Sequence, residues 1–573
     1  MSESSRAPAL LLPAFAVALG YHIVMQILWM GSDHGDSSGV CCDMVGYVLD
    51  ANRWMLHGQV WLRDAFEWPV WSSSPHAFSA QLNDLAGQVW NQLGWNPRQG
   101  WYQLLAATLF SANRGEEFGF VLSTLFVALT QVALGAMAWR LGGPWAGALA
   151  AALYPLMPAV AWLERRVDVY STTACVAAVA ALALLRSASM TRPLPTAAFA
   201  GLAVLGACIS PRQTDNVLLE LALVGMAGWA WLRGLSLGRD AFGEQLPRLR
   251  ALAFGVVVAL FAGLSGYWLI NVAVSNHQHY LDYVRGEANQ EGYVASHARY
   301  SPVALMAYPR HIVELAWTRW NAVGLGLGAL VWLVRGRGRA EILGWALFPL
   351  VALSLLSKKN PYYIYMIFPA LSLMTALGVA ALPWRALRWV VGFALVSVAG
   401  VQHLARSAPQ WVAGTPLATV AWNNPSAGED RAFQSPNWAF ELSPRPAPES
   451  TIFVEKVIDS LPVSACACNY VMVAGGNVQW GDFAVPLAMR DPCARLVFWP
   501  IPQAVEDTGV LLVGQANTPL NRDENERLVA IRSLAQERYT LVDRSTQSQG
   551  VLEIWRRDDA WFSNYCANHS QGR

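Results

Sequence analysis

Asp43, an acidic residue that follows the first apolar stretch of this 573-residue chain, is the first candidate for chemistry. It is followed by Tyr47, Asp50 and Ala51, at spacings that place all four residues on one face of a short helix. Apolar residues between them predict that this helix lies along a membrane surface, with Asp43 at its electropositive start. An ionised carboxylate in that position can accept a proton from a hydroxyl nucleophile. The same position also suits a simple helix cap.

A second charged group is the run Glu164-Arg165-Arg166-Val167-Asp168. Glu164 and Asp168 are four residues apart, so a helical turn would place them together, with Arg165 beside Asp168. Two interpretations stay open, which are an ion-pair cluster at a helix end and a site that binds a charged substrate.

The composition indicates that these acids belong to a membrane protein. Hydrophobic residues make up 54% of the chain and charged residues only 14%, whereas soluble domains carry about 25% charged residues. The charge-poor runs predict about 11 transmembrane helices, with a range of roughly 9–13. These runs are 8–30, 118–139, 143–163, 169–185, 194–211, 215–232, 251–275, 321–334, 342–357, 361–382 and 389–403. A net charge of +1 gives no electrostatic reason to expect nucleic acid as a partner.

The distribution of Arg and Lys predicts how the chain is oriented. Short loops rich in Arg alternate with the two long loops, 31–116 and 276–319. Basic loops face the cytoplasm, so we expect a multi-pass protein of the cytoplasmic (inner) membrane with a cytoplasmic N-terminus. Both long loops and the C-terminal part then lie outside. Several cations depart from this rule by falling in outer turns: Arg165, Arg166, Arg212, Lys358 and Lys359.

The C-terminal part of the chain has a different pattern. After residue 404 the long apolar runs end, and five short β-type runs appear together with a helical stretch at 522–537. Strands that alternate with helices predict a small α/β domain. We therefore expect a transmembrane domain over 1–404 and an extracytoplasmic α/β domain over 405–573.

Three motifs, taken in order, resemble those of a known group. Asp43, Tyr47, Ala51 and Gly58 follow the first span; Asp168 lies in a later outer turn; Lys358 or Lys359, Tyr362 or Tyr363, and Pro369 open a late span. This order is similar to that of the polytopic GT-C glycosyltransferases, especially bacterial members similar to protein O-mannosyltransferases and to the aminoarabinose transferase of lipid A. The chain departs from the common pattern at Met44, where a second acid is usual.

The resemblance implies a GT-C-like helical bundle that acts as an inverting glycosyltransferase. The donor would be a sugar on polyprenyl phosphate, and the acceptor a hydroxyl of a lipid, protein or polysaccharide at the outer membrane face. Asp43 would be the base, and Asp168 would position an arginine or the sugar. The residues that would bind substrate are Tyr47, Arg165, Arg166, Arg212, Lys358, Tyr362 and Tyr363. The Arg and Lys side chains among them would stabilise the leaving phosphate.

Metal dependence and two other functions stay open in the sequence. Some relatives of this kind use a divalent metal ion, but no strong ligand set is visible, and His277-x-His279 is the one pair to test. A transporter or flippase of lipid-linked glycans would predict charges within the spans and repeated halves. Glu220 is the one clear candidate for such a charge, and no repeat is visible. A membrane-anchored assembly protein of the cell envelope is the third possibility.

Overall fold

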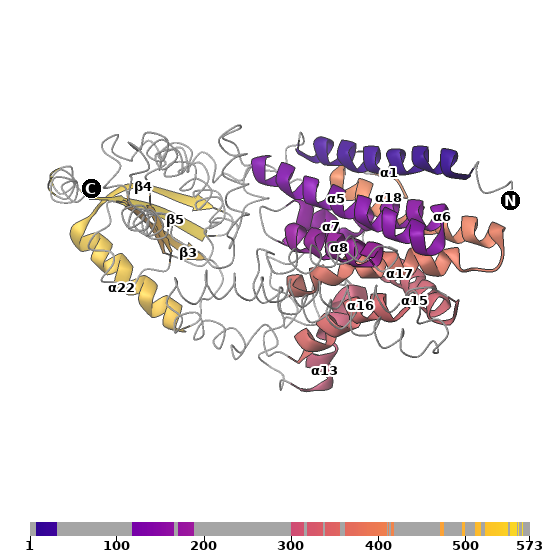
Figure 1. The fold of residues 1–573 in the computed structure, drawn as a ribbon. Coiled ribbons are helices and arrows are strands. Elements are labelled where there is room, and N and C mark those ends of the chain that lie inside the picture. The colour runs from indigo at the N-terminus through magenta and orange to yellow at the C-terminus, as the bar shows by residue number, and fades with distance from the viewer. Residues whose placement is uncertain are drawn as a thin grey trace, which may run out of the picture. The chain divides into compact units, whose positions relative to one another are not determined.

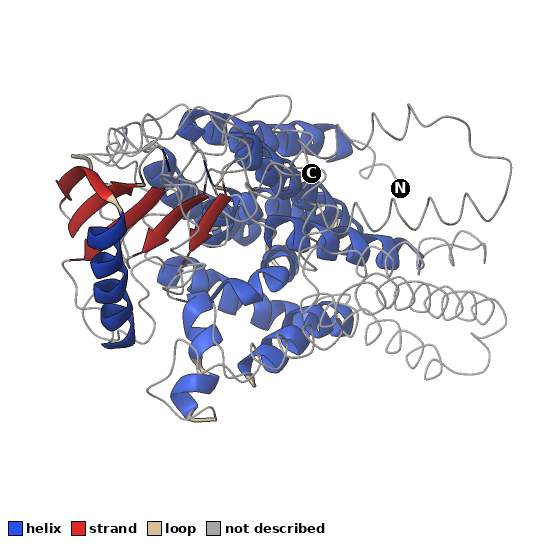
Figure 2. Cartoon of the chain, turned by 90° about the vertical axis from the view of Figure 1, so that its left-hand side faces the viewer, coloured by secondary structure: helices blue, strands red, loops and turns tan. Residues whose placement is uncertain are grey.

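The structure is a computed structural model, and the part of the chain that it describes is discontinuous. It comprises residues 7–30, 117–165, 170–187, 300–313, 318–335, 339–355, 361–408, 411, 414–416, 470–474, 495–498, 510–516, 522–547, 550–557, 560 and 564. These residues fall into two compact units, one built from helices and the other from a five-stranded sheet with one helix (Figures 1 and 2).

The helical unit contains eleven α-helices and one 3-10 helix among the described residues. They are α1 (Ala7–Met30), α5 (Glu117–Gly142), α6 (Pro144–Leu156), α7 (Pro158–Glu164), α8 (Tyr170–Ser187), α13 (Pro302–Leu305), α14 (Ala307–His311), α15 (Thr318–Arg335), α16 (Arg339–Ser354), the 3-10 helix η4 (Pro361–Ile367), α17 (Phe368–Ala380) and α18 (Arg385–Ser407).

Each predicted apolar run within the described residues coincides with helix, and two of the runs contain a break. Run 143–163 divides into α6 and α7 at Met157, whose backbone is extended (φ −64°, ψ 133°). Pro158 explains the break, because a residue before proline is disfavoured in the helical conformation. Run 361–382 begins as η4 and continues as α17, in which proline occupies the first turn.

The number of spans stays a prediction. Runs 194–211, 215–232 and 251–275 lie outside the described residues. Within the described part, two helical stretches are long and apolar enough to cross a membrane, Phe120–Gly142 and Arg385–Leu404, and shorter apolar helices accompany them.

The core of the helical unit is centred on α17. Each of its residues from Phe368 to Val379 is buried, and α17 packs against α6, α8, α15, α16, α18 and η4. A helix that is apolar on all sides can bury all sides, and this one supplies a surface to each neighbour.

Two glycines allow α15 and α17 to approach closely. A Cβ atom added to Gly378 would collide with the backbone of Gly328. Small residues at a helix crossing let the two backbones come into van der Waals contact, which is a common way to join helices in a membrane.

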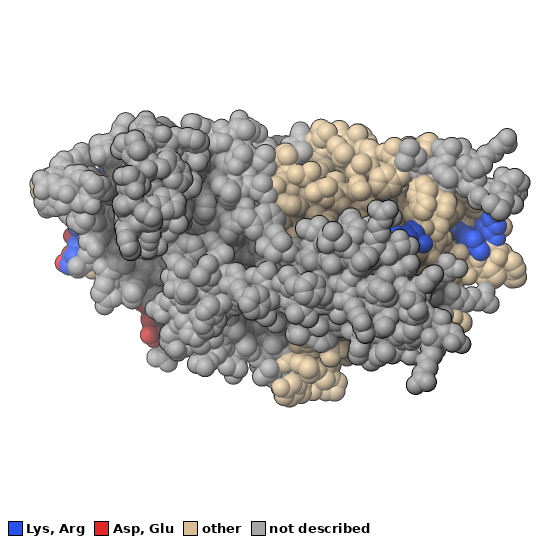
Figure 3. Space-filling model, viewed as in Figure 1, with Lys and Arg blue, Asp and Glu red and all other residues tan. Residues whose placement is uncertain are grey.

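Three basic residues lie at one end of the described bundle. Arg140 lies in the last turn of α5, and Arg385 and Arg388 lie in the first turn of α18. Figure 3 shows a largely uncharged described surface on the helical unit, with its basic side chains toward one end. This distribution is the one that the loop analysis assigns to the cytoplasmic side.

The second unit is a mixed sheet with strand order β2-β1-β3-β5-β4. Strands β1 (Tyr470–Ala474), β2 (Arg495–Phe498) and β3 (Val510–Ala516) are parallel, while β4 (Thr540–Gln547) and β5 (Gly550–Arg556) are antiparallel to their neighbours. Helix α22 (Arg522–Arg538) joins β3 to β4 and packs on the sheet through Leu528, Ile531 and Ala535. The predicted strands and helix of this part are confirmed, whereas its boundary at residue 404 and its side of the membrane stay predictions.

The glycine contact leads to a stability prediction. We expect Gly378→Ala to destabilise the helical unit by about 1–3 kcal/mol, because a methyl group must displace the α15 backbone. Gly326→Ala on α15 is the matched control, since a Cβ there meets nothing within 4 Å; it should be neutral or stabilising by up to about 1 kcal/mol. Thermal unfolding of the purified proteins in detergent measures both. Equal midpoints for the two variants would contradict the close approach.

Candidate functional site

Four helix ends meet at the end of the bundle that is remote from Arg140 and Arg385. Trp29, near the end of α1, packs edge-to-face on Phe120, near the start of α5, with ring centroids 5.2 Å apart. Arg165, directly after α7, reaches Gln26 on α1 and Ser407 at the end of α18. The sequence predicts all four of these helix ends on the outer side, and the side itself stays a prediction.

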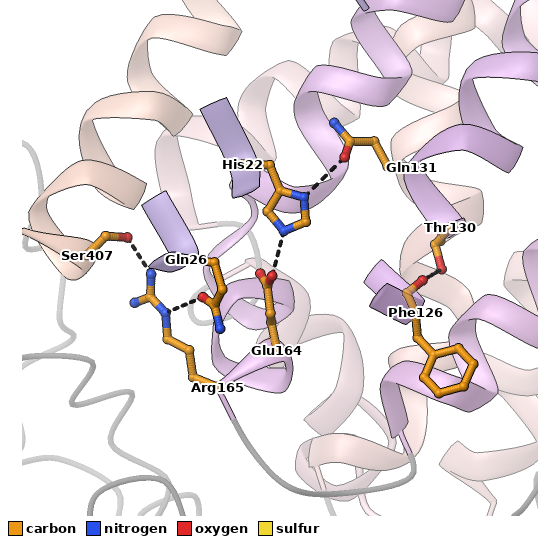
Figure 4. A network of polar contacts seen from close by, with 8 residues as sticks. All are labelled: His22, Gln26, Phe126, Thr130, Gln131, Glu164, Arg165 and Ser407. Carbon is orange, nitrogen blue, oxygen red and sulfur yellow. Dashed lines mark hydrogen bonds and ion pairs between the residues drawn. The ribbon is translucent and has the colours of Figure 1, made fainter. Parts of the chain in front are cut away.

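A buried histidine connects three of these helices (Figure 4). His22 Nε2 lies 2.6 Å from Glu164 Oε1, and His22 Nδ1 lies 3.2 Å from Gln131 Oε1. The side chains of His22 and Glu164 are 0% and 1% exposed. Because both ring nitrogens face oxygen atoms, a doubly protonated ring donates to both, and its contact with Glu164 is then an ion pair.

The neighbouring arginine connects α7 to two further helices. Arg165 Nε donates to Gln26 Oε1 at 3.4 Å, and Nη2 donates to Ser407 Oγ. Its guanidinium carbon lies 5.0 Å from the centroid of a Trp29 ring, a cation–π arrangement. Ser407 Oγ in turn donates to the carbonyl oxygen of His403 at 2.8 Å. We call His22, Gln26, Gln131, Glu164, Arg165 and Ser407 the helix-end network.

The structure gives Glu164 a partner that is distant in the sequence but in direct contact in space. The sequence predicts a helical turn that gathers Glu164 and Asp168, but α7 ends at Glu164 and Arg165 already has non-helical angles (φ −92°, ψ 27°). Glu164 contacts His22, which is 142 residues away in the sequence. A long-range contact of this kind leaves no trace in local spacing.

Only part of the predicted site falls within the described residues. The side chain of Arg165 is described, and it is 2% exposed. Tyr362 and Tyr363 lie on η4, although their side chains are outside the described set. The remaining predicted residues lie outside the described residues: Asp43, Tyr47, Arg166, Asp168, Arg212 and Lys358.

The described elements bring together two residues that are close in the sequence to predicted site residues. Tyr170, the first residue of α8, packs edge-on against Tyr365 of η4, with ring centroids 5.8 Å apart. Tyr170 comes two residues after Asp168, and Tyr365 two residues after Tyr363. Trp345 on α16 fixes η4 by donating its indole N–H to the carbonyl oxygen of Met366 at 3.0 Å.

Sequence reasoning missed His22, Gln26, Gln131 and Ser407. The first three are polar residues inside apolar helices, and His22 and Gln26 are four apart, on one face of α1. Polar and ionisable residues within membrane helices are candidates for function, and they mark the network in the sequence. What they cannot show is which of them contact one another.

A metal site is not visible in the described part. Within those residues, no three His, Cys, Asp or Glu side chains come together as ligands. His277 and His279, the pair that the sequence offers for a divalent ion, lie outside the described residues.

Comparison with known proteins identifies the fold. No protein-family model matches the sequence, and no curated protein matches it. The structure is similar to ArnT, the lipid A aminoarabinose transferase, from Cupriavidus metallidurans, solved with undecaprenyl phosphate bound and in the apo state. The TM-scores are 0.58 and 0.55, at 14% identity in both cases, and the matches cover 95% and 96% of this chain and 98% of each ArnT chain.

A more distant match is the oligosaccharyltransferase AglB of Archaeoglobus fulgidus. It has 12% identity and a TM-score of 0.46 over 97% of this chain and 75% of that chain, which is too low for an argument. The likeness to ArnT, at a TM-score of 0.58, confirms for the fold the resemblance that the motifs predict. Identity this low shows the fold alone.

Beside η4 lies a histidine whose titration should affect stability. His311 is at the end of α14, which packs against α16 and η4. Burial lowers the pKa of its imidazole to about 3. In the unfolded chain the ring has a pKa of about 6.5, so below that pH the unfolded state binds a proton that the folded state does not.

We therefore expect acid to destabilise the protein partly through His311. Its contribution to stability should be complete above about pH 6.5 and should fall as the pH drops from 6.5 toward 3. Thermal unfolding of wild type and His311→Gln at pH 7.5 and pH 5 provides the measurement. The unfolding temperature of the wild type should fall further between pH 7.5 and pH 5 than that of the variant. Parallel losses would show that His311 already titrates normally in the folded protein.

Proposed function

We propose that this protein is an inverting glycosyltransferase of the outer face of the cytoplasmic membrane. It moves a sugar from a polyprenyl-phosphate-linked donor to the hydroxyl of a lipid, protein or polysaccharide acceptor. The observation that carries the proposal is the full-length fold likeness to ArnT, at a TM-score of 0.58 over 95% of the chain. That ArnT structure holds undecaprenyl phosphate, a lipid phosphate of the class proposed for the leaving group here.

The chemistry assigns a separate task to each kind of residue. Asp43 accepts the proton of the acceptor hydroxyl as the oxygen attacks the anomeric carbon. The bond from that carbon to the phosphate oxygen breaks on the opposite face, so the anomeric configuration inverts. Negative charge develops on the polyprenyl phosphate, and cations stabilise it.

Four basic residues are proposed as partners of the phosphate: Arg165, Arg166, Arg212 and Lys358. Guanidinium groups can bind phosphate oxygens in pairs. Arg165 also contacts Gln26, Ser407 and Trp29, and these contacts hold the end of α7. Asp168 would position an arginine or the sugar. The substrate site would be lined by Tyr47, Tyr362 and Tyr363.

The base is tested by replacing its carboxylate. Asp43→Asn should lower the release of polyprenyl phosphate from a sugar-loaded lipid donor by about 100-fold or more, because the amide cannot accept the proton. Asp36→Asn, in the same loop, is the matched control and should retain wild-type turnover. Mass spectrometry of lipid extracts from reconstituted protein measures the products.

Two results would count against this function. Full transfer by Asp43→Asn would remove Asp43 as the base. A wild type that turns over no lipid-linked donor, but carries such lipids across a vesicle membrane, would favour a transporter.

Recognition of the phosphate is tested at an outer arginine. Arg212→Ala should raise the KM for the lipid-linked donor by about tenfold, since one charge-assisted contact is worth about 1.5–3 kcal/mol. Arg248→Ala, in a loop predicted to be cytoplasmic, is the control and should leave KM unchanged. Steady-state kinetics with varied donor separates the two, and equal KM values would contradict the assignment of Arg212.

A further inference from the structure

We propose that His22 and Glu164 are positioning residues for this sugar transfer. Their buried contact holds the end of α7, and thereby the start of the link that leads to Asp168. The inference rests on the proposed function for its catalytic part only, because the contact itself can be tested without turnover.

The first step of the argument is geometric. Glu164 is the last residue of α7 and is joined to His22 on α1 at 2.6 Å, while His22 is joined to Gln131 on α5 at 3.2 Å. Arg165, the next residue, is joined to Gln26 on α1 and to Ser407 on α18. Two consecutive residues at one helix end are therefore fixed directly to α1 and α18, and through His22 to α5, and every side chain involved is buried.

The second step concerns the length of the link. Only four residues, 166–169, separate Arg165 from Tyr170, and Asp168 is one of them. Tyr170 is 6% exposed and packs against Tyr365 of η4. Both residues that flank this link are therefore buried and held, one by the helix-end network and the other by a ring contact. The covalent chain therefore limits how far Asp168 can lie from these two held residues, because four residues reach only about 14 Å even when extended.

The third step is energetic. A buried ion pair is weak evidence for stability, because removing both charges from water costs about as much as their attraction returns. Within the described part of the chain, Glu164 Oε2, Gln26 Nε2 and Gln131 Nε2 have no hydrogen-bond partner. Such atoms are costly when buried, and apolar residues of similar size would pack at least as stably. The helix-end network therefore contributes little to the free energy of folding. Its directional contacts instead fix the end of α7 in one position.

Several charged and polar side chains of the described residues lie around His22 and Glu164. They include Gln131 from α5, Tyr154 from α6, Arg165 from the end of α7 and Gln26 from α1 itself. Arg165 carries a positive charge close to the imidazole, and the carboxylate of Glu164 offsets its repulsion of a protonated His22.

The experiment compares two replacements of similar size at His22. His22→Leu removes both ring donors, and His22→Gln keeps an amide that can donate to Glu164. Thr375→Val is the matched control, because Thr375 is equally buried on α17 and its hydroxyl donates to the carbonyl oxygen of Leu371 at 3.0 Å. The full-length protein is used in lipid nanodiscs throughout.

Two readouts are taken on each variant. Hydrogen exchange of the α7 backbone, including the amides of Ala161 and Arg165, reports whether the helix end is held. Steady-state kinetics with an undecaprenyl-phosphate-linked sugar reports kcat and KM separately. If His22→Leu does not fold, Glu164→Gln replaces it, because the neutral amide keeps the size of the carboxylate.

The expected result differs between the variants. His22→Leu should speed exchange in α7 by roughly tenfold or more, and it should lower kcat by about 100-fold while KM changes by less than about threefold. His22→Gln should recover most of both losses, and Thr375→Val should match wild type in α7 exchange and in kcat.

Each contrary outcome has its own meaning. Unchanged exchange in His22→Leu would show that the contact does not hold α7. Faster exchange with unchanged kcat, or a loss carried by KM alone, would overturn the positioning role. A wild type without turnover would overturn the proposed function and with it the catalytic part, while the exchange data would still decide whether His22 and Glu164 hold the helix end.

Discussion

The close approach of α17 to α15 is the contact on which the described bundle depends. Gly378 lies against the backbone of Gly328, and no larger residue fits at that crossing without a shift. Because α17 is buried on all sides, it gives α6, α8, α16 and α18 a common packing surface. It also sets the position of η4, which precedes it directly and contacts Tyr170 through Tyr365.

Apolar packing holds the helices together in the centre of the bundle, and polar contacts fix their positions at the helix ends. Apolar packing tolerates many sequences and fixes positions only to the extent that volumes match. Hydrogen bonds such as those from Arg165 to Gln26 and Ser407 are directional, so they restrict how helix ends meet. Apolar packing therefore forms the centre of the bundle, and directional polar contacts fix one end of it, which includes the predicted site residue Arg165.

The likeness to ArnT illustrates the same division. At 14% identity the fold is kept over almost the entire length of both chains, as expected where hydrophobic pattern and volume are the main requirements. Activity depends on a few residues placed on that fold. In this chain Met44 stands where the common motif has a second acid, so the proposed base, Asp43, has no adjacent carboxylate.

The sequence by itself determined the long helices of the described part, the C-terminal strands and the GT-C resemblance, because these follow from local periodicity and from short motifs in order. β-type runs marked all five strands of the described sheet, whereas the break between α6 and α7 came only from the structure. Within the predicted site the sequence identified the residue types but not their partners. Only the tertiary structure decided that Glu164 contacts His22 and that Arg165 reaches Ser407, 242 residues away. The physical reason is that such contacts depend on how helices distant in sequence pack, and local spacing carries no information about the partner across the bundle.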